Sequence, residues 1–479
     1  MYAFDIDDRR PAAKGRQLDP SVYTEIERTC PRQDILPHIQ SFSWFCIDAL
    51  RQQKSLLFMR PTLRHLAIHV HRSDDPPLGA YVQGILQLAP GLTKLEIRSQ
   101  SPMRDIQPEL LELIGGLRDL RHIIVPMYFL TEGTMAELSK VPRLEIIELA
   151  APIERGIGDT RDVSNFRPAF VTRKPFPALR RLAFTAHLQH ASEFLNDPSA
   201  PRDISSLYLY ILAIDNPHVL DHLLSILATQ FKLLTEVYLD FVLGPSSPIV
   251  TPPPPSAARP SLHTLRPLLS HTHLVHLELR WDYQLGLTEA DLEHVAGSWP
   301  ALEVLHLNSE PIPEQPVKPI LTARALLPFA RHCRRLRSLA LYLDGDKPAD
   351  LHSHPPPPVR PFRALEVLAF GSSPLSKVEP IVLFLSHLCP LACRISPGVR
   401  WPDAYGIALD RAGVADERRL RMSEWWGKWN EVGRVLPLVI KARMDERARV
   451  AAATRGREDR SRVEELELEV QKLRLRLGP

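Results

Sequence analysis

The sequence predicts an α/β fold, a right-handed leucine-rich-repeat solenoid of about 12 irregular repeats with a helical C-terminal extension. A phrase of the form Leu-x-x-Leu-x-Leu recurs across roughly 330 residues, and segments with helical spacing of apolar residues lie between its copies. One such unit cannot bury its own apolar edge, so the copies must stack on one another to form a continuous core.

The repeated phrase marks the strands. Its alternation places every second side chain on the core side, as in a β-strand. The copies begin at Ile39, Leu63, Leu92, Leu120, Leu144, Leu179, Ile204, Leu234, Leu274, Leu302, Leu336 and Leu365. Their spacing of 24 to 40 residues lies at or above the usual leucine-rich-repeat period of roughly 20–29.

Helices are expected between the strands. Thr288 is a candidate N-cap, and Leu292 and Val295 follow it on one helical face. Apolar residues at helical spacing also occupy residues 217–227, 323–333 and 380–388. Because parallel neighbouring strands require a crossover, this alternation predicts a parallel sheet on the concave side and helices on the convex side.

The chain is expected to consist of an N-terminal flank (residues 1–33), the solenoid (34–398), a helical cap (399–450) and a charged tail (451–479). Apolar residues at helical spacing in the cap are Trp425, Trp429, Val432, Leu436 and Val439. We expect this face to cover the last repeat, since a terminal unit otherwise exposes its core. A partner-binding helix is the alternative.

The tail is expected to be broken by its glycine, between residues 455 and 462, before a short helix begins. In that helix Val463, Leu466, Val470, Leu473 and Leu477 alternate steps of three and four, which makes a two-heptad coiled-coil seam. Coiled-coil predictions rest on about three or four heptads. A weak dimer and a frayed, solvated helix therefore both remain open.

Composition and charge limit the partners and the compartment. The net charge of +3 is too small and too dispersed to indicate nucleic-acid binding. The five cysteines form no metal or disulfide framework, and no signal peptide or membrane-spanning stretch is recognisable. We therefore expect a cytoplasmic or nuclear protein that inserts into no membrane.

Proline is frequent, at 46 residues, and it clusters in insertions that follow repeat strands. These insertions cover residues 150–176, 244–260, 310–319 and 344–361. All four are expected at the edge of the sheet where the strands end, which is often the binding rim of a solenoid. The proline runs at 252–255 and 355–358 are expected to be loops, with docking sites for proline-reading domains as the alternative.

No pattern in the chain indicates catalysis. It contains no Gly-x-Ser-x-Gly, no glycine-rich phosphate loop, no His-Glu-x-x-His and no Cys-x-x-Cys. His271, His273 and His276 are close in sequence, but a zinc site needs about four ligands in fixed geometry. The sequence predicts no enzyme, no metal and no cofactor. The competing hypothesis is an enzyme, or a binding or regulatory protein such as a GTPase activator, that works through the rim loops.

The side chains that flank the last apolar position of each phrase are expected to face solvent on the concave side. Tyrosine is enriched there, and tyrosine and arginine are favoured at protein-binding hot spots. The predicted partner-binding residues are Tyr208, Tyr210, Tyr238, Asp240, Glu278, Arg280, His306, Asn308 and Tyr342. Their mixture of aromatic area with both charge signs suits a protein or peptide partner better than a phosphate backbone. Packing of the tyrosines against one another is the alternative.

The chain also resembles a known family, the fungal (basidiomycete) F-box proteins with irregular leucine-rich repeats. The segments that carry the resemblance are ILPHIQSFSW (35–44), TLRPLL (264–269), HLVHLELR (273–280), LTEADL (287–292), WPALEVLHL (299–307), LLPFARHCRRLRSLAL (326–341) and the ending from WWGKW (425–429) to LPLV (436–439). The resemblance covers residues 19–443 and implies a substrate-recognition component of an F-box type ubiquitin ligase. An F-box itself is not recognisable before the first repeat, so a cullin–RING adaptor is expected as a partner only if an F-box lies upstream.

Overall fold

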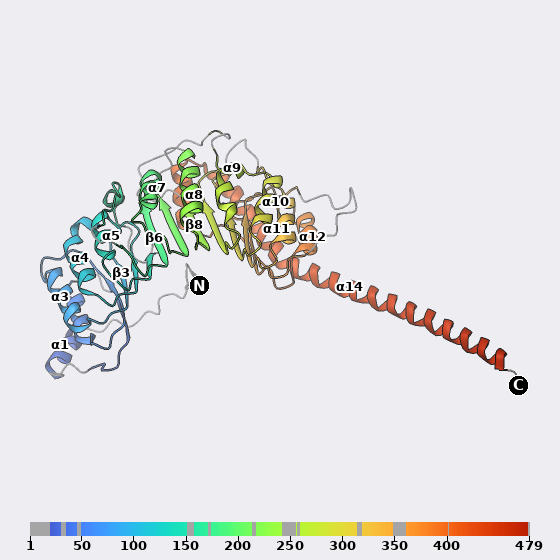
Figure 1. Cartoon of the computed structure of the whole chain (residues 1–479), viewed down its shortest axis with the longest axis horizontal. Helices are drawn as coiled ribbons and strands as arrows, with labels where there is room; N and C mark the ends of the chain where they lie inside the picture. Colours follow the sequence, from blue (N-terminus) through green and yellow to red (C-terminus); the bar gives the residue numbers. More distant parts are fainter. Residues whose placement is uncertain are drawn as a thin grey trace. The chain divides into compact units, whose positions relative to one another are not determined.

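The computed structural model describes residues 20–29, 35–45, 49–150, 158–170, 174–212, 217–241, 255, 259–313, 319–347, 361–400 and 402–477. The chain divides into two compact units, Met1–Leu209 and Tyr210–Pro479. Figure 1 labels some of the helices and strands of both units.

Parallel strands are the repeating element. The described residues contain thirteen strands in chain order. They are β1 (Ser41–Trp44), β2 (His65–His69), β3 (Lys94–Arg98), β4 (His122–Val125), β5 (Ile146–Leu149), β6 (Arg181–Ala186), β7 (Ser206–Ile211), β8 (Glu236–Asp240), β9 (His276–Arg280), β10 (Val304–Leu307), β11 (Ser338–Leu341), β12 (Val367–Ala369) and β13 (Arg394–Ser396). The predicted leucine-rich-repeat class is confirmed. β13 was not predicted, because this strand buries only Ile395 and has no leucine phrase.

Stacked aliphatic side chains form the core of the first unit. In the parallel register Leu66 lies beside Leu95, and Leu95 lies beside Ile123. All three side chains are completely buried. Burial of one such side chain contributes about 1.5–3 kcal/mol, so each repeat is stabilised mainly by the neighbours on which it stacks.

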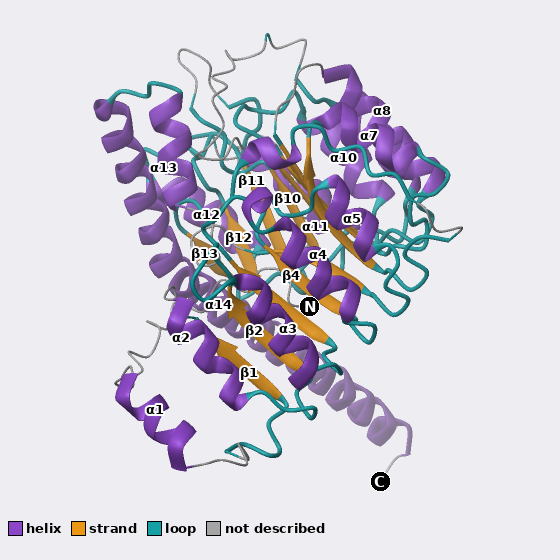
Figure 2. Cartoon of the chain, turned by 90° about the vertical axis from the view of Figure 1, so that its left-hand side faces the viewer, coloured by secondary structure: helices purple, strands orange, loops and turns teal. Residues whose placement is uncertain are grey.

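Helices connect the strands and cover one face of them, as Figure 2 shows for α3, α4 and α5. The first unit contains α1 (Pro20–Thr29), α2 (Ala49–Lys54), η1 (Ser55–Phe58), α3 (Leu78–Leu88), η2 (Met103–Asp105), α4 (Gln107–Gly116), α5 (Glu132–Leu138), η3 (Thr160–Val163) and α7 (Leu188–Asn196). The second unit contains α8 (Pro217–Gln230), α9 (Leu262–Leu265), η5 (Arg266–Ser270), α10 (Glu289–Ser298), η6 (Ala323–Leu326), α11 (Leu327–His332), α12 (Val378–Leu388), α13 (Pro402–Arg411) and α14 (Asp416–Leu477). Helix labels with η denote 3₁₀ turns.

The expected start of one helix is confirmed in detail. The Thr288 hydroxyl accepts a hydrogen bond from the backbone N–H of Asp291 at 3.3 Å, and the Asp291 carboxylate accepts one from the Thr288 N–H at 2.8 Å. This capping box satisfies two amide groups that α10 leaves unpaired at its first turn.

The end of the second unit is covered by α14. The indole of Trp429 is fully buried, stacks on Phe370 at 4.0 Å between ring centroids and donates its Nε1–H to the Ser373 carbonyl at 3.0 Å. Val432 and Leu436 are also completely buried on the same helix, whereas Trp425 and Val439 are only partly buried. This apolar face packs on α12 and β13, which is the position expected of a terminal cap.

The expected break in the tail is wrong. α14 continues without interruption through residues 455–462. A single glycine inside a helix costs only about 1 kcal/mol relative to alanine, and the alanine, arginine and glutamate residues around Gly456 favour a helix. Among the described residues, no helix combines the length and apolar character needed to cross a bilayer.

The predicted proline runs lie outside the described residues, apart from Pro255. The same holds for residues 151–157, 171–173 and 314–318 of the predicted rim insertions, and for Cys30 and Cys46. Cys333, Cys389 and Cys393 are buried free thiols.

Candidate recognition site

The nine predicted partner-binding residues lie on or directly after strands β7 to β11. The expectation that all of them face solvent is wrong. Six are buried, namely Tyr210, Tyr238, Asp240, Glu278, Asn308 and Tyr342, and three are partly buried, namely Tyr208, Arg280 and His306. In the second unit most of these side chains are buried because they contact one another and residues of the C-terminal segment.

Five of the nine residues form one group on three neighbouring strands. The register places Tyr238 of β8 beside Glu278 of β9, and His306 of β10 on the other side of Glu278. The same register places Asp240 beside Arg280. Tyr208 and Tyr210 lie on β7, where the first unit ends and the second begins. Tyr342 follows β11, two strands beyond Glu278.

Glu278 is the centre of the group. The guanidinium Nη1 of Arg400 donates to both carboxylate oxygens of Glu278, at 2.9 and 3.2 Å, and lies 3.4 Å from Nδ1 of His306. Nε2 of His276 lies 3.9 Å from the same carboxylate. Nδ1 of His276 forms a hydrogen bond of 3.0 Å with the Tyr238 hydroxyl. A buried carboxylate is stable in its charged form only with such partners.

Arg400 and the two histidines decide the charge of Glu278. Burial raises the pKa of the Glu278 carboxyl, but Arg400, His276 and His306 outweigh burial and hold the pKa well below its ordinary value. Burial lowers the pKa of His276, and Glu278 opposes this shift only in part. At neutral pH the group therefore contains a carboxylate, a guanidinium and an uncharged imidazole at His276.

A second ionic contact runs beside the first. Arg280 donates to the Asp240 carboxylate at 2.8 Å, and its other terminal nitrogen lies 3.8 Å from Glu310. Glu310 also accepts a hydrogen bond from the backbone N–H of Arg400 at 2.6 Å. Burial raises the pKa of Glu310 above its ordinary value, although Arg280 and the Arg400 amide act in the opposite direction.

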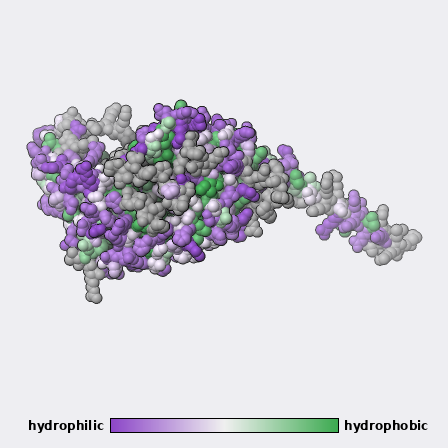
Figure 3. All heavy atoms as spheres, turned by 90° about the horizontal axis from the view of Figure 1, so that it is seen from above, coloured by the Kyte–Doolittle hydropathy of each residue, from purple (hydrophilic) through white to green (hydrophobic). Residues whose placement is uncertain are grey.

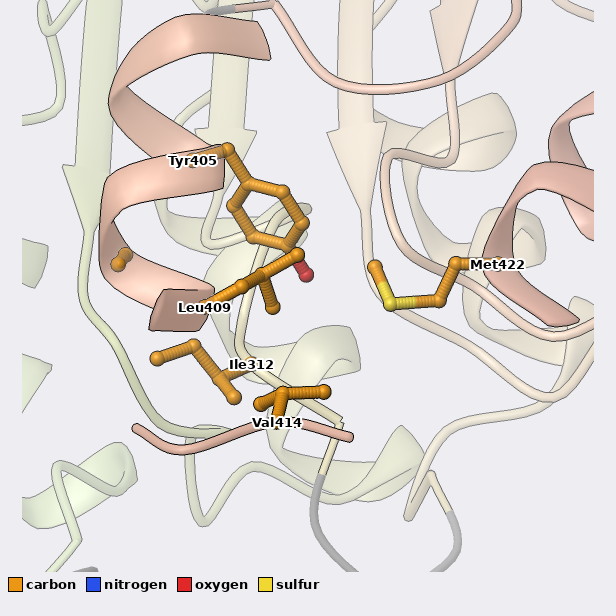
Figure 4. Packing of buried hydrophobic residues seen from close by; sticks show 6 residues of the cluster. Ile312, Tyr405, Leu409, Val414 and Met422 are labelled. Carbon is orange, nitrogen blue, oxygen red and sulfur yellow. The ribbon is translucent and has the colours of Figure 1, made fainter. Parts of the chain in front are cut away.

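A hydrophobic cluster fixes the segment that bears Arg400. Tyr405 and Leu409 of α13 pack with Ile312, Val414 and Met422, all of them buried (Figure 4). The Tyr405 hydroxyl donates to the Pro311 carbonyl at 2.9 Å, and Arg418 donates to the Pro313 carbonyl at 3.0 Å. These contacts attach the chain after β13 to the residues that follow β10, and so bring Arg400 to Glu278.

Asn308 has an internal role that explains its burial. Its backbone φ is +46°, a left-handed conformation that asparagine adopts more readily than most residues. Its side-chain oxygen accepts a hydrogen bond from the Trp281 N–H at 2.9 Å, and its side-chain nitrogen donates to the Tyr283 carbonyl at 2.6 Å. Asn308 therefore fixes the turns after β9 and β10, and its amide group is not directed at solvent.

Arg400, Glu310 and His276 also belong to this group, although the sequence did not predict them as members. Arg400 is 122 positions from Glu278, and no periodic signal connects the two. The sequence places His276 close to His271 and His273, but His271 is buried and His273 is exposed, with its ring hydrogen-bonded to the Lys232 carbonyl at 3.1 Å. In the described part of the chain, no cluster of His, Cys, Asp or Glu could hold a metal ion.

Comparisons with known proteins bear on the fold only. No protein-family model matches the chain, and a search of curated proteins finds no match. Among solved structures, 62 chains match. One of them is described as "Crystal structure of TLR13-ssRNA13 complex"; it is 13% identical, with a TM-score of 0.34, and the match covers 76% of this chain and 56% of that one. The chain thus spans about half the length of that protein.

Proposed function

We propose that this chain is a protein-recognition scaffold, and that a partner protein or peptide binds it around Tyr238, Glu278, Arg280, His306 and Arg400 in the second unit. The observation that supports this most is the group itself. Rigid strands hold aromatic, anionic and cationic side chains side by side, and the side chains of Arg280, His306 and Arg400 keep 17%, 18% and 38% of their surface exposed. Such a mixture is typical of the anchor residues of protein interfaces.

The resemblance to F-box proteins with leucine-rich repeats supports a more specific proposal. A solenoid that recognises a substrate, joined to an adaptor-binding module, is the arrangement of a ubiquitin-ligase substrate receptor. We therefore propose that the partner is a substrate delivered for ubiquitination. The adaptor would bind an F-box and not the repeats, so the two parts of the proposal are tested separately.

The recognition part is tested by affinity purification from a cell extract with mass spectrometry. Alanine substitutions are poor probes, because Arg280→Ala would leave the buried Asp240 carboxylate without its cation and Tyr238→Ala would remove a buried ring. The conservative pair Tyr238→Phe and Arg280→Lys keeps the packing while removing one hydroxyl and the planar fork. The matched control is Arg337→Lys, since Arg337 pairs with Glu366 on the exposed surface.

A partner that is recovered by the wild type and by Arg337→Lys, and reduced at least ~10-fold by the double variant, supports the proposed site. Undiminished recovery by a folded double variant places the binding surface elsewhere. For the ubiquitin-ligase part, the product of the complete gene should co-purify with a cullin–RING adaptor. If no adaptor is recovered, the ligase role is rejected. The recognition site is judged separately, by the affinity purification with the double variant.

A further inference from the structure

The last part of α14 leaves apolar side chains exposed in a regular pattern. Val463, Leu466 and Val470 retain 52%, 54% and 46% of their surface. They are separated by steps of three and four, so they lie on one side of the helix. Figure 1 shows this end of α14 extending beyond α12 of the same unit, and Figure 3 shows hydrophobic and hydrophilic residues side by side along it.

We propose that this seam is an interface with a second copy of the chain, in the form of a short, parallel, two-stranded coiled coil. The choice of occupant follows first from residue type. In heptad notation Val463 and Val470 occupy position a, and Leu466 occupies position d. The sequence continues the pattern with leucine at 473 and 477. A β-branched residue at a with leucine at d favours two parallel strands over three or four.

The charges beside the seam select the same arrangement. In a parallel pair, the residue at position g faces position e of the next heptad on the partner helix. Arg462 at g would then face the second copy's glutamate at position 467, and Glu469 at g would face the second copy's arginine at position 474. Both contacts join opposite charges. An antiparallel pairing, in which position a packs against position d of the other copy, would instead bring the two copies of Glu469 together, which is repulsive.

Two heptads bury less apolar surface than the roughly 1,200 Å² of a stable specific interface. The dimer is therefore expected to be concentration-dependent. Its consequence is bivalency, because each dimer would carry two solenoids and could hold a partner with two binding sites more tightly than either copy alone. This inference does not depend on which partner the solenoid recognises.

The test is sedimentation velocity or mass photometry of the full chain over a concentration series. We expect a reversible monomer–dimer equilibrium, and we expect Leu466→Lys with Val470→Lys to weaken it at least ~10-fold. The matched control is Leu468→Lys. Leu468 is 55% exposed on the same helix but lies off the seam, at position f, so its substitution should leave the equilibrium unchanged.

Orientation is tested by a cysteine at position 463, which is an a position of the seam. Oxidation of Val463→Cys should link two copies through that residue in a parallel dimer, because equal a positions face each other there, against the wild type as background for the five natural cysteines. The proposal is overturned by a monomer throughout the concentration series. It is also overturned by a dimer that withstands the seam substitutions, or that responds equally to Leu468→Lys. A dimer that weakens as expected but forms no bond at 463 refutes the parallel orientation.

Discussion

The indole of Trp429 is expected to be the largest single contribution to the C-terminal cap. Its side chain has no exposed surface, stacks on Phe370 and donates a hydrogen bond to the Ser373 carbonyl. Trp429→Ala removes all three interactions and should lower the free energy of unfolding by about 3–5 kcal/mol. Trp429→Phe keeps an aromatic ring against Phe370 and loses the hydrogen bond, so we expect about 1–2 kcal/mol.

The measurement is urea-induced unfolding followed by far-ultraviolet circular dichroism, which does not depend on tryptophan emission. Leu438→Ala is the control, because Leu438 lies on the same helix with 68% of its surface exposed and should change stability by less than about 0.5 kcal/mol. The predicted role of Trp429 is wrong if Trp429→Ala is no more destabilising than Leu438→Ala, or if the phenylalanine variant is as unstable as the alanine variant.

Three further predictions concern the second unit. Arg400→Ala should destabilise by about 1–3 kcal/mol, since it removes the cation from a buried carboxylate. Arg337→Ala, on an exposed pair, should change the urea midpoint far less in the same titration. Gly371→Ala should destabilise strongly by thermal unfolding, because φ is +47° and a Cβ atom would overlap the Ser309 carbonyl oxygen. Burial lowers the pKa values of His271 and His276 below 6.5 in the folded state. The two histidines therefore contribute fully to stability above pH 6.5, and this contribution is lost as the pH falls through their pKa values in the folded state. Urea midpoints over a pH series measure the loss, in the wild type and in variants that carry glutamine at both positions.

Local periodicity is why the repeat strands could be predicted. Each Leu-x-x-Leu-x-Leu phrase predicts a strand from a few neighbouring residues alone. In the structure the leucines of each strand stack on those of the next, as Leu66 does on Leu95. β13 has three residues and one buried side chain, too little for any pattern. The position of Tyr238 beside Glu278 also followed from the repeats, because equal positions in neighbouring repeats share one register.

The environment of that site could not be predicted in the same way. Solvent exposure of Glu278 was inferred from its strand position, but Arg400 comes from a segment with no repeat phrase. The attachment of that segment depends on the packing of Tyr405 and Leu409 with Ile312, which is a tertiary event without a local signature. The continuity of α14 through Gly456 shows the opposite case, in which a local helix breaker was outweighed by its neighbours.

The contacts from the C-terminal segment to the residues after β10 have a consequence for how the second unit loses its structure. In a linear array each repeat touches only its neighbours, and unfolding proceeds inwards from an end, one repeat at a time. Arg400, Tyr405 and Arg418 reach instead to Glu278, Pro311 and Pro313, past the intervening strands β11 and β12. The last repeats therefore contact each other directly at their two ends, in addition to the contacts between neighbouring strands. They should open together, as one cooperative block, and not fray singly from the C-terminus.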